Sequence, residues 1–122
     1  MKKLIVLIGA AAIAVAPVVF AHEGEEHEAQ KEITVKGEVI DIACYVEHNG
    51  SGEKHIACAK MCMENGLPVG IKANDGKTYL LVGDHKSLNK ELVEFAGKTI
   101  TMKGHAVSRD GINLIADAEI VK

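Results

Sequence analysis

The chain has 122 residues, with 14 Lys or Arg against 17 Asp or Glu, so its formal net charge is −3 at pH 7. This length suits one small domain with a modest core and argues against two domains. The negative charge and the absence of tryptophan argue against nucleic acid as a partner, because phosphates attract basic side chains and bases stack on aromatic ones.

Residues 1–21 have the layout of a secretory signal peptide. Lys2 and Lys3 precede an almost unbroken apolar run, and small residues stand before the expected cleavage site after Ala21. Cleavage makes His22 the first residue of a periplasmic or secreted protein with no remaining membrane segment. An uncleaved membrane anchor is the alternative, since the run is almost long enough to span a bilayer. Export places the cysteines in an oxidising compartment, where thiols end as disulfides or as metal ligands.

Residues 22–32 form an acidic tail without large apolar side chains, and we expect this tail to be disordered. His22 and His27 stand among its carboxylates and offer a loose metal site, although solvation is the commoner fate of such a tail. The folded domain is predicted to span residues 33–122.

The first strand is expected to begin at Ile33, where apolar residues start to alternate with polar ones. After Val39 the alternation slips by one residue and continues to Cys44. Such a slip close to Gly37 predicts a β-bulge that bends a long strand so that it serves two sheets. Cys44 then lies at the end of this strand.

Beyond a Gly-rich break, residues 53–65 are predicted to form a short helix that Gly66 ends. The remaining apolar patterns predict two hairpins with a second short helix between them. These elements are the strands 69–73 and 77–82 around an Asn-Asp-Gly turn, a helix from Ser87 to Gly97, and strands from Ile100 to Ala106 and from Ile112 to Ile120 around Asp110-Gly111.

The expected fold is mainly β with two short helices, arranged as a five-stranded Greek-key barrel of the OB-fold type. The Cys-bearing helix is inserted between the first and second strands. The long first strand with Gly37, the segment SLNKELVEFAGKTITMKG and the final hairpin resemble small secreted bacterial OB-fold proteins over roughly residues 33–121. The segment ACYVEHNGSGEKHIACAKMCMENGLPVGI resembles one that recurs in uncharacterised secreted bacterial proteins, which implies no function. In OB-folds, the loop after the first strand commonly binds ligands.

Four side chains form the candidate site. On a helix, His55, Cys58 and Cys62 stand within about 60° of one another on one face. Cys44 supplies a fourth ligand from the end of the first strand. Three thiolates and an imidazole suit tetrahedral Zn²⁺ and also accept Cu⁺. We therefore predict an exported metal-binding module for metal carriage, sensing or structural stabilisation, with no catalytic residues.

The alternative is a non-catalytic binding or interaction module in which Cys44 forms a structural disulfide with Cys58 or Cys62 and one thiol stays free. A disulfide between Cys58 and Cys62 requires the helix to unwind. A redox-active thiol, with His55 lowering the pKa of Cys58, is a third interpretation. The chain lacks the common catalytic motifs, so an enzyme is not expected. The expected partners are a metal ion and another periplasmic protein.

Overall fold

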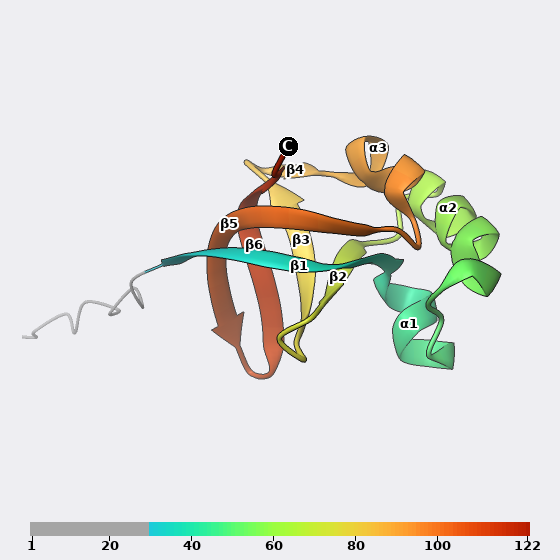
Figure 1. Ribbon diagram of the computed structural model, residues 1–122, viewed down its shortest axis with the longest axis horizontal. Coiled ribbons are helices and arrows are strands. Elements are labelled where there is room, and N and C mark those ends of the chain that lie inside the picture. The colour runs from blue at the N-terminus through green and yellow to red at the C-terminus, as the bar shows by residue number, and fades with distance from the viewer. Residues whose placement is uncertain (1–29) are drawn as a thin grey trace, which may run out of the picture.

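The computed structural model of the protein describes residues 30–122. The predicted signal peptide, and the predicted tail up to residue 29, lie outside the described residues. The elements follow one another as β1 (Lys31–Asp41), α1 (Ile42–His48), the 3-10 turn η1 (Glu53–His55), α2 (Ile56–Glu64), β2 (Val69–Ala73), β3 (Thr78–Gly83), β4 (Lys86–Ser87), α3 (Asn89–Leu92), the 3-10 turn η2 (Val93–Phe95), β5 (Thr99–Arg109) and β6 (Ile112–Ile120). The helices gather at one end of the strands (Figure 1).

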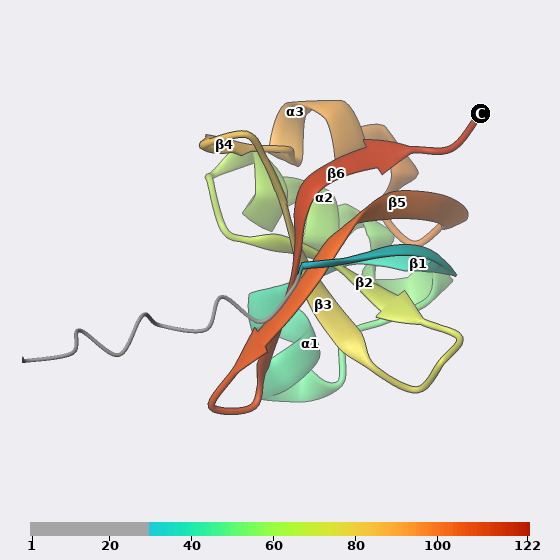
Figure 2. The ribbon, with the colours of Figure 1, turned by 90° about the vertical axis from the view of Figure 1, so that its left-hand side faces the viewer.

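Five of the strands form a closed barrel. β1 pairs with β2 and with β5, β5 pairs with β6, and a parallel pairing joins β6 to β3, which returns to β2. The two-residue β4 pairs with β3 alone and lies outside the ring. In Figure 2 the β5–β6 hairpin extends away from α3. The mainly β architecture with a five-stranded barrel confirms that part of the prediction, and both hairpins form where their turn residues indicated.

β1 is the long strand that serves two neighbours. Residues 31–38 pair with β5, and residues 37–41 pair with β2. Gly37 belongs to both pairings, and a Cβ atom there would lie 2.3 Å from the carbonyl oxygen of Lys72, so a side chain would clash. The pairing with β2 runs without a register shift, so the predicted bulge beside Gly37 is wrong. A register shift occurs instead between Lys103 and His105 of β5.

Both ends of β1 differ from the prediction. β1 begins at Lys31 instead of Ile33, because backbone pairing with β5 continues where the side chains are polar. It ends at Asp41, and the next residues form α1 instead of extending the strand to Cys44. Asp41 caps this helix, since its Oδ2 accepts a 2.8 Å hydrogen bond from the Cys44 N–H. A seven-residue helix is marginal alone and depends on its cap and its packing.

The Cys-bearing helix forms where expected, as η1 followed by α2. The chain leaves α2 through Gly66, whose φ of 88° is left-handed, and the Leu67 N–H donates to the Cys62 carbonyl at 3.0 Å. The second predicted helix is the short α3 continued by η2. Residues 30–122 thus hold three α-helices instead of the predicted two, and none is long and apolar enough to cross a membrane.

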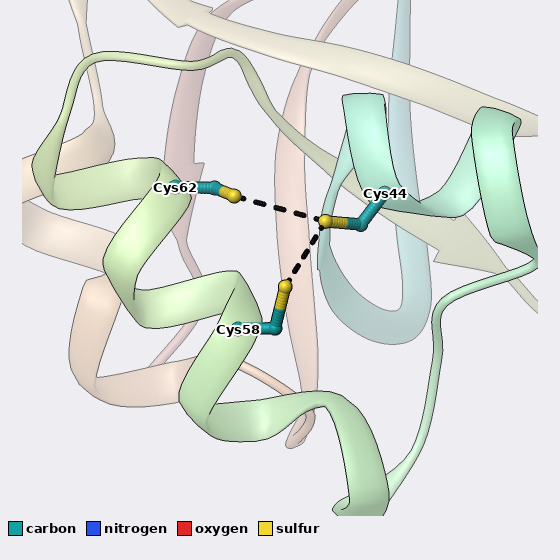
Figure 3. A group of neighbouring side chains, drawn as sticks. All are labelled: Cys44, Cys58 and Cys62. Carbon is teal, nitrogen blue, oxygen red and sulfur yellow. Dashed lines mark hydrogen bonds between the residues drawn. The ribbon is translucent and has the colours of Figure 1, made fainter.

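One cluster of buried apolar side chains joins the strands of the barrel to the helices. Its most deeply buried apolar side chains come from β1, α2, β2, α3, β5 and β6, namely Val39, Met63, Ile71, Leu92, Met102 and Ile115. Met63 and Ala59 seat α2 against this core. Packing on that side leaves Cys58 and Cys62 directed toward α1, which fixes the position of the candidate site (Figure 3).

Candidate metal centre

Three sulfur atoms meet between α1 and α2. Cys44 projects from α1, and Cys58 and Cys62 project from successive turns of α2 (Figure 3). The Cys44 Sγ lies 3.3 Å from the Cys58 Sγ and 3.7 Å from the Cys62 Sγ. All three sulfur atoms lie within 4.8 Å of one another. The structure therefore brings together three of the four predicted ligands from two separate helices.

The spacing of the sulfur atoms suits a single metal ion. Zinc bonds to thiolate sulfur at about 2.3 Å, and tetrahedral angles at the metal then place two sulfurs about 3.8 Å apart. The distance of 3.7 Å between the Cys44 and Cys62 sulfurs lies close to this value, and the 3.3 Å between the Cys44 and Cys58 sulfurs is somewhat shorter. A disulfide bond, at about 2.05 Å, is much shorter, and all three cysteines of the chain are free thiols in this structure.

His55 is the predicted ligand that the sulfur cluster does not include. Among the described residues, the cluster consists of the three cysteines alone. His55 ends η1 and has φ −107° and ψ 1°, so the helical angle of 100° per residue does not extend back from α2 to it. Its side chain lines a small open cavity together with Glu38, Gly52 and Gly97.

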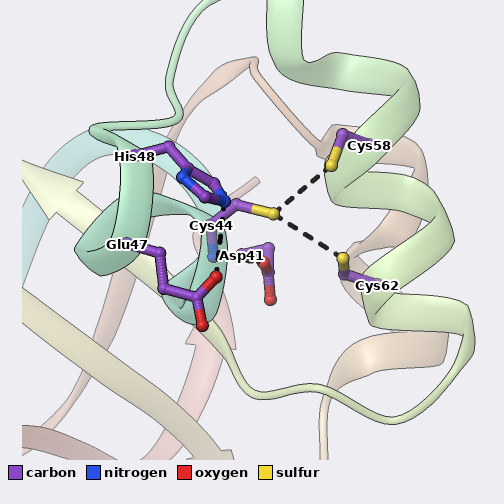
Figure 4. Close-up of polar contacts among 6 residues, drawn as sticks. All are labelled: Asp41, Cys44, Glu47, His48, Cys58 and Cys62. Atoms are coloured by element: carbon purple, nitrogen blue, oxygen red, sulfur yellow. Dashed lines mark hydrogen bonds and ion pairs between the residues drawn. The ribbon is translucent and has the colours of Figure 1, made fainter.

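Asp41 is a residue of the site that the sequence analysis missed. Its side chain is 1% exposed and lies beside the thiols at the start of α1 (Figure 4). The Oδ2 atom caps α1 through the Cys44 N–H, whereas the buried Oδ1 atom has no hydrogen-bond partner among the described residues. The available signal was an aspartate directly before an apolar run that contains a cysteine, which is a typical helix N-cap position.

The surroundings raise the pKa of two of the thiols, those of Cys44 and Cys62. The pKa of Cys44 is raised, first by its hydrogen bond with Cys58, then by the Asp41 carboxylate and by burial. Burial also raises the pKa of Cys62, and the negative charge of Asp41 adds to this effect. Since a metal ion binds thiolate and not thiol, metal binding here must release protons.

His48 lies near the cluster in sequence and faces a different environment. It stands one turn after Cys44 on α1, and its Nε2 lies 3.3 Å from a carboxylate oxygen of Glu47, with both side chains largely exposed (Figure 4). His22 and His27 of the acidic tail lie outside the described residues. No histidine in residues 30–122 therefore joins the three sulfurs.

Comparisons with models of protein families, with curated proteins and with solved structures found no match. The chemistry of the site itself is thus the basis for assigning a function.

Proposed function

We propose that the protein is an exported metal-binding domain in which the thiolates of Cys44, Cys58 and Cys62 bind one Zn²⁺ or Cu⁺ ion. The observation that carries this proposal is the set of three sulfur atoms within 4.8 Å of one another. Thiolates are the side-chain ligands that these borderline and soft ions prefer. The two helices that hold the sulfurs are positioned by the same barrel, so the site is largely formed before an ion arrives.

The barrel supports an OB-fold assignment. Its strands neighbour one another in the closed order β1–β2–β3–β6–β5, and α1 and α2 both lie in the connection between β1 and β2. OB-folds commonly bind ligands with this connection. By analogy with such OB-folds, the bound ion serves in metal carriage, sensing or structural stabilisation.

The signal-peptide pattern of residues 1–21 supports export to the periplasm or beyond. In that compartment a solvent-accessible metal site meets other exported proteins, so a partner that delivers or accepts the ion belongs to the proposal. A role without catalysis is proposed because the chain lacks the common catalytic motifs.

A competing function deserves a test because the Cys44 and Cys58 sulfurs lie only 3.3 Å apart. Their oxidation to a disulfide in an oxidising compartment would staple α1 to α2 and leave Cys62 free. The domain would then be a binding module without a metal. The two functions differ in the number of thiols and in the mass of the native protein.

The test uses the full-length chain, expressed with its own N-terminal segment and recovered from the periplasm of a bacterial host under anaerobic conditions. Native mass spectrometry with metal analysis is expected to find one Zn or Cu ion per chain, and alkylation after chelation and unfolding is expected to label three thiols. Cys58→Ser should lower metal occupancy severalfold. A metal-free chain with a single alkylatable thiol contradicts the proposal and supports the disulfide.

A further inference from the structure

The Asp41 carboxylate is buried without a counter-charge. It is 1% exposed, and none of the ion pairs found among residues 30–122 includes it. A buried carboxylate loses the favourable hydration of its charge unless a cation or several hydrogen bonds compensate it. Within the described part of the chain, the Asp41 side chain has a single hydrogen bond, from the Cys44 N–H.

The two carboxylate oxygens have different surroundings. Oδ2 is held by the Cys44 N–H at 2.8 Å, and this bond fixes the orientation of the carboxylate relative to the cysteine that follows it on α1. Oδ1 is buried and unpartnered. Its carboxylate lies beside the thiols at the start of α1 (Figure 4). One oxygen thus positions the group, and the other remains available to a ligand.

A divalent cation among the sulfurs would satisfy this arrangement. It would place a cation beside the carboxylate and give Oδ1 a partner, while the Cys44 N–H continues to orient the carboxylate. The oxygens of Asp41 are not within 4.8 Å of every sulfur, since the cluster so defined contains the three cysteines only. Binding therefore requires the Asp41 carboxylate and the sulfurs to move closer to one another around the ion.

We propose that Asp41 is the fourth ligand and that the site is a tetrahedral Zn²⁺ site with three thiolates and one carboxylate, in which Asp41 strengthens the binding of Zn²⁺ more than that of Cu⁺. This inference rests on the proposed function and specifies its metal. Zn²⁺ accepts carboxylate oxygen alongside thiolate sulfur. Cu⁺ is a soft ion that prefers sulfur, so a buried carboxylate adds little to its binding. His55 is not required.

The test compares Zn²⁺ and Cu⁺ affinities of the wild-type domain and of two Asp41 variants, measured by competition with chromophoric chelators. Asp41→Asn and Asp41→Ser both retain an oxygen that caps the Cys44 N–H, so both preserve α1. We expect each to lower Zn²⁺ affinity at least about tenfold, as the loss of a ligand should, and to change Cu⁺ affinity less than about threefold. Circular dichroism establishes that the variants are folded.

His55→Ala and His48→Ala are the matched controls. Each removes a histidine that lies near the cysteines in sequence, and both variants should keep wild-type Zn²⁺ affinity. Equal losses for Zn²⁺ and Cu⁺ in the Asp41 variants would overturn the inference, since Asp41 would then act only on the position of Cys44. Unchanged Zn²⁺ affinity in both, or a tenfold loss in His55→Ala or His48→Ala, would also overturn it. A wild-type domain that binds neither ion refutes the proposed function itself.

Discussion

The side-chain amide of Asn89 donates a 2.8 Å hydrogen bond to the backbone carbonyl of Met63, the residue that follows Cys62 in α2. The same amide donates to the Leu67 carbonyl at 2.7 Å. Asn89 is buried at the start of α3, so one side chain joins α3 to the end of the helix that carries two of the three thiols. A residue of α3, far from the cysteines in sequence, therefore helps to hold the end of α2 in place.

Replacing Asn89 with Ala is expected to lower the free energy of unfolding by about 1–3 kcal/mol, because it removes one of two donors to the Met63 carbonyl and the side-chain donor to the Leu67 carbonyl. Urea denaturation of the metal-free domain measures the effect. Asn65→Ala is the matched control, since the Asn65 amide donates to the Met61 carbonyl at 2.8 Å in an exposed position. Its expected cost is below about 1 kcal/mol. Equal losses in both variants would show that Asn89 does not join the helices as described.

Gly97 contacts the beginning of α2, and its replacement should be costly. It has a φ of 74°, and a Cβ atom there would lie 2.5 Å from the Ile56 Cγ1. Gly76 has a φ of 87° but no heavy atom within 4 Å of such a Cβ. Gly97→Ala should therefore destabilise the domain by about 1–3 kcal/mol more than Gly76→Ala. Both substitutions strain the backbone, but only the new methyl group at residue 97 collides with a neighbouring side chain. Equal denaturation midpoints would contradict the packing of α2 described above.

Acid should weaken the β2–β3 hairpin through Asp75. The Lys77 N–H and the Tyr79 hydroxyl each donate a 2.8 Å hydrogen bond to its carboxylate, and these bonds hold the pKa of Asp75 below its ordinary value. The folded state thus binds fewer protons than the unfolded state in this range, so the stabilisation is complete above about pH 4 and is lost as pH falls through the folded pKa. Denaturation midpoints measured from pH 7 to pH 2.5 should fall less steeply for Asp75→Asn than for the wild type. Parallel curves would refute this coupling.

Metal should raise the melting temperature of the domain. An ion present at a hundred times its dissociation constant adds about 2.7 kcal/mol, which corresponds to about 10–20 °C for a domain of this size. A calorimetric scan with Zn²⁺ should show this shift, and a chelator should reverse it. Mg²⁺ is the control ion, because it prefers oxygen ligands. The Cys58→Ser variant should lose most of the Zn²⁺ shift. A shift that survives in this variant would place the bound ion elsewhere.

The barrel was predictable from sequence because its signals are local. Alternating apolar residues in β5 and β6, with Asp110 and Gly111 between them, indicate a hairpin without knowledge of any distant contact. α1 gave no comparable signal, since its seven residues are too few to show a helical period and continue the apolar residues of β1. Its cap at Asp41 was the only local mark of the change from strand to helix.

The sequence predicted the three cysteines of the candidate site, but it predicted neither the true position of His55 nor the presence of Asp41. Cys58 and Cys62 share one face of a helix, and that follows from their spacing. The position of His55 depends on a 3-10 turn, in which the angle per residue differs, so the spacing rule failed there. The sequence marks Asp41 as a candidate helix N-cap, but its place beside the sulfurs depends on how α1 folds back from β1, which the local pattern does not give.

X-ray absorption spectroscopy of the zinc-loaded domain tests the central claim most directly, since it counts the atoms bound to the metal. Three thiolates from Cys44, Cys58 and Cys62 predict three sulfur scatterers at about 2.3 Å from zinc. A first shell made only of nitrogen and oxygen, or one with a single sulfur, would contradict the claim that the three cysteines bind one ion.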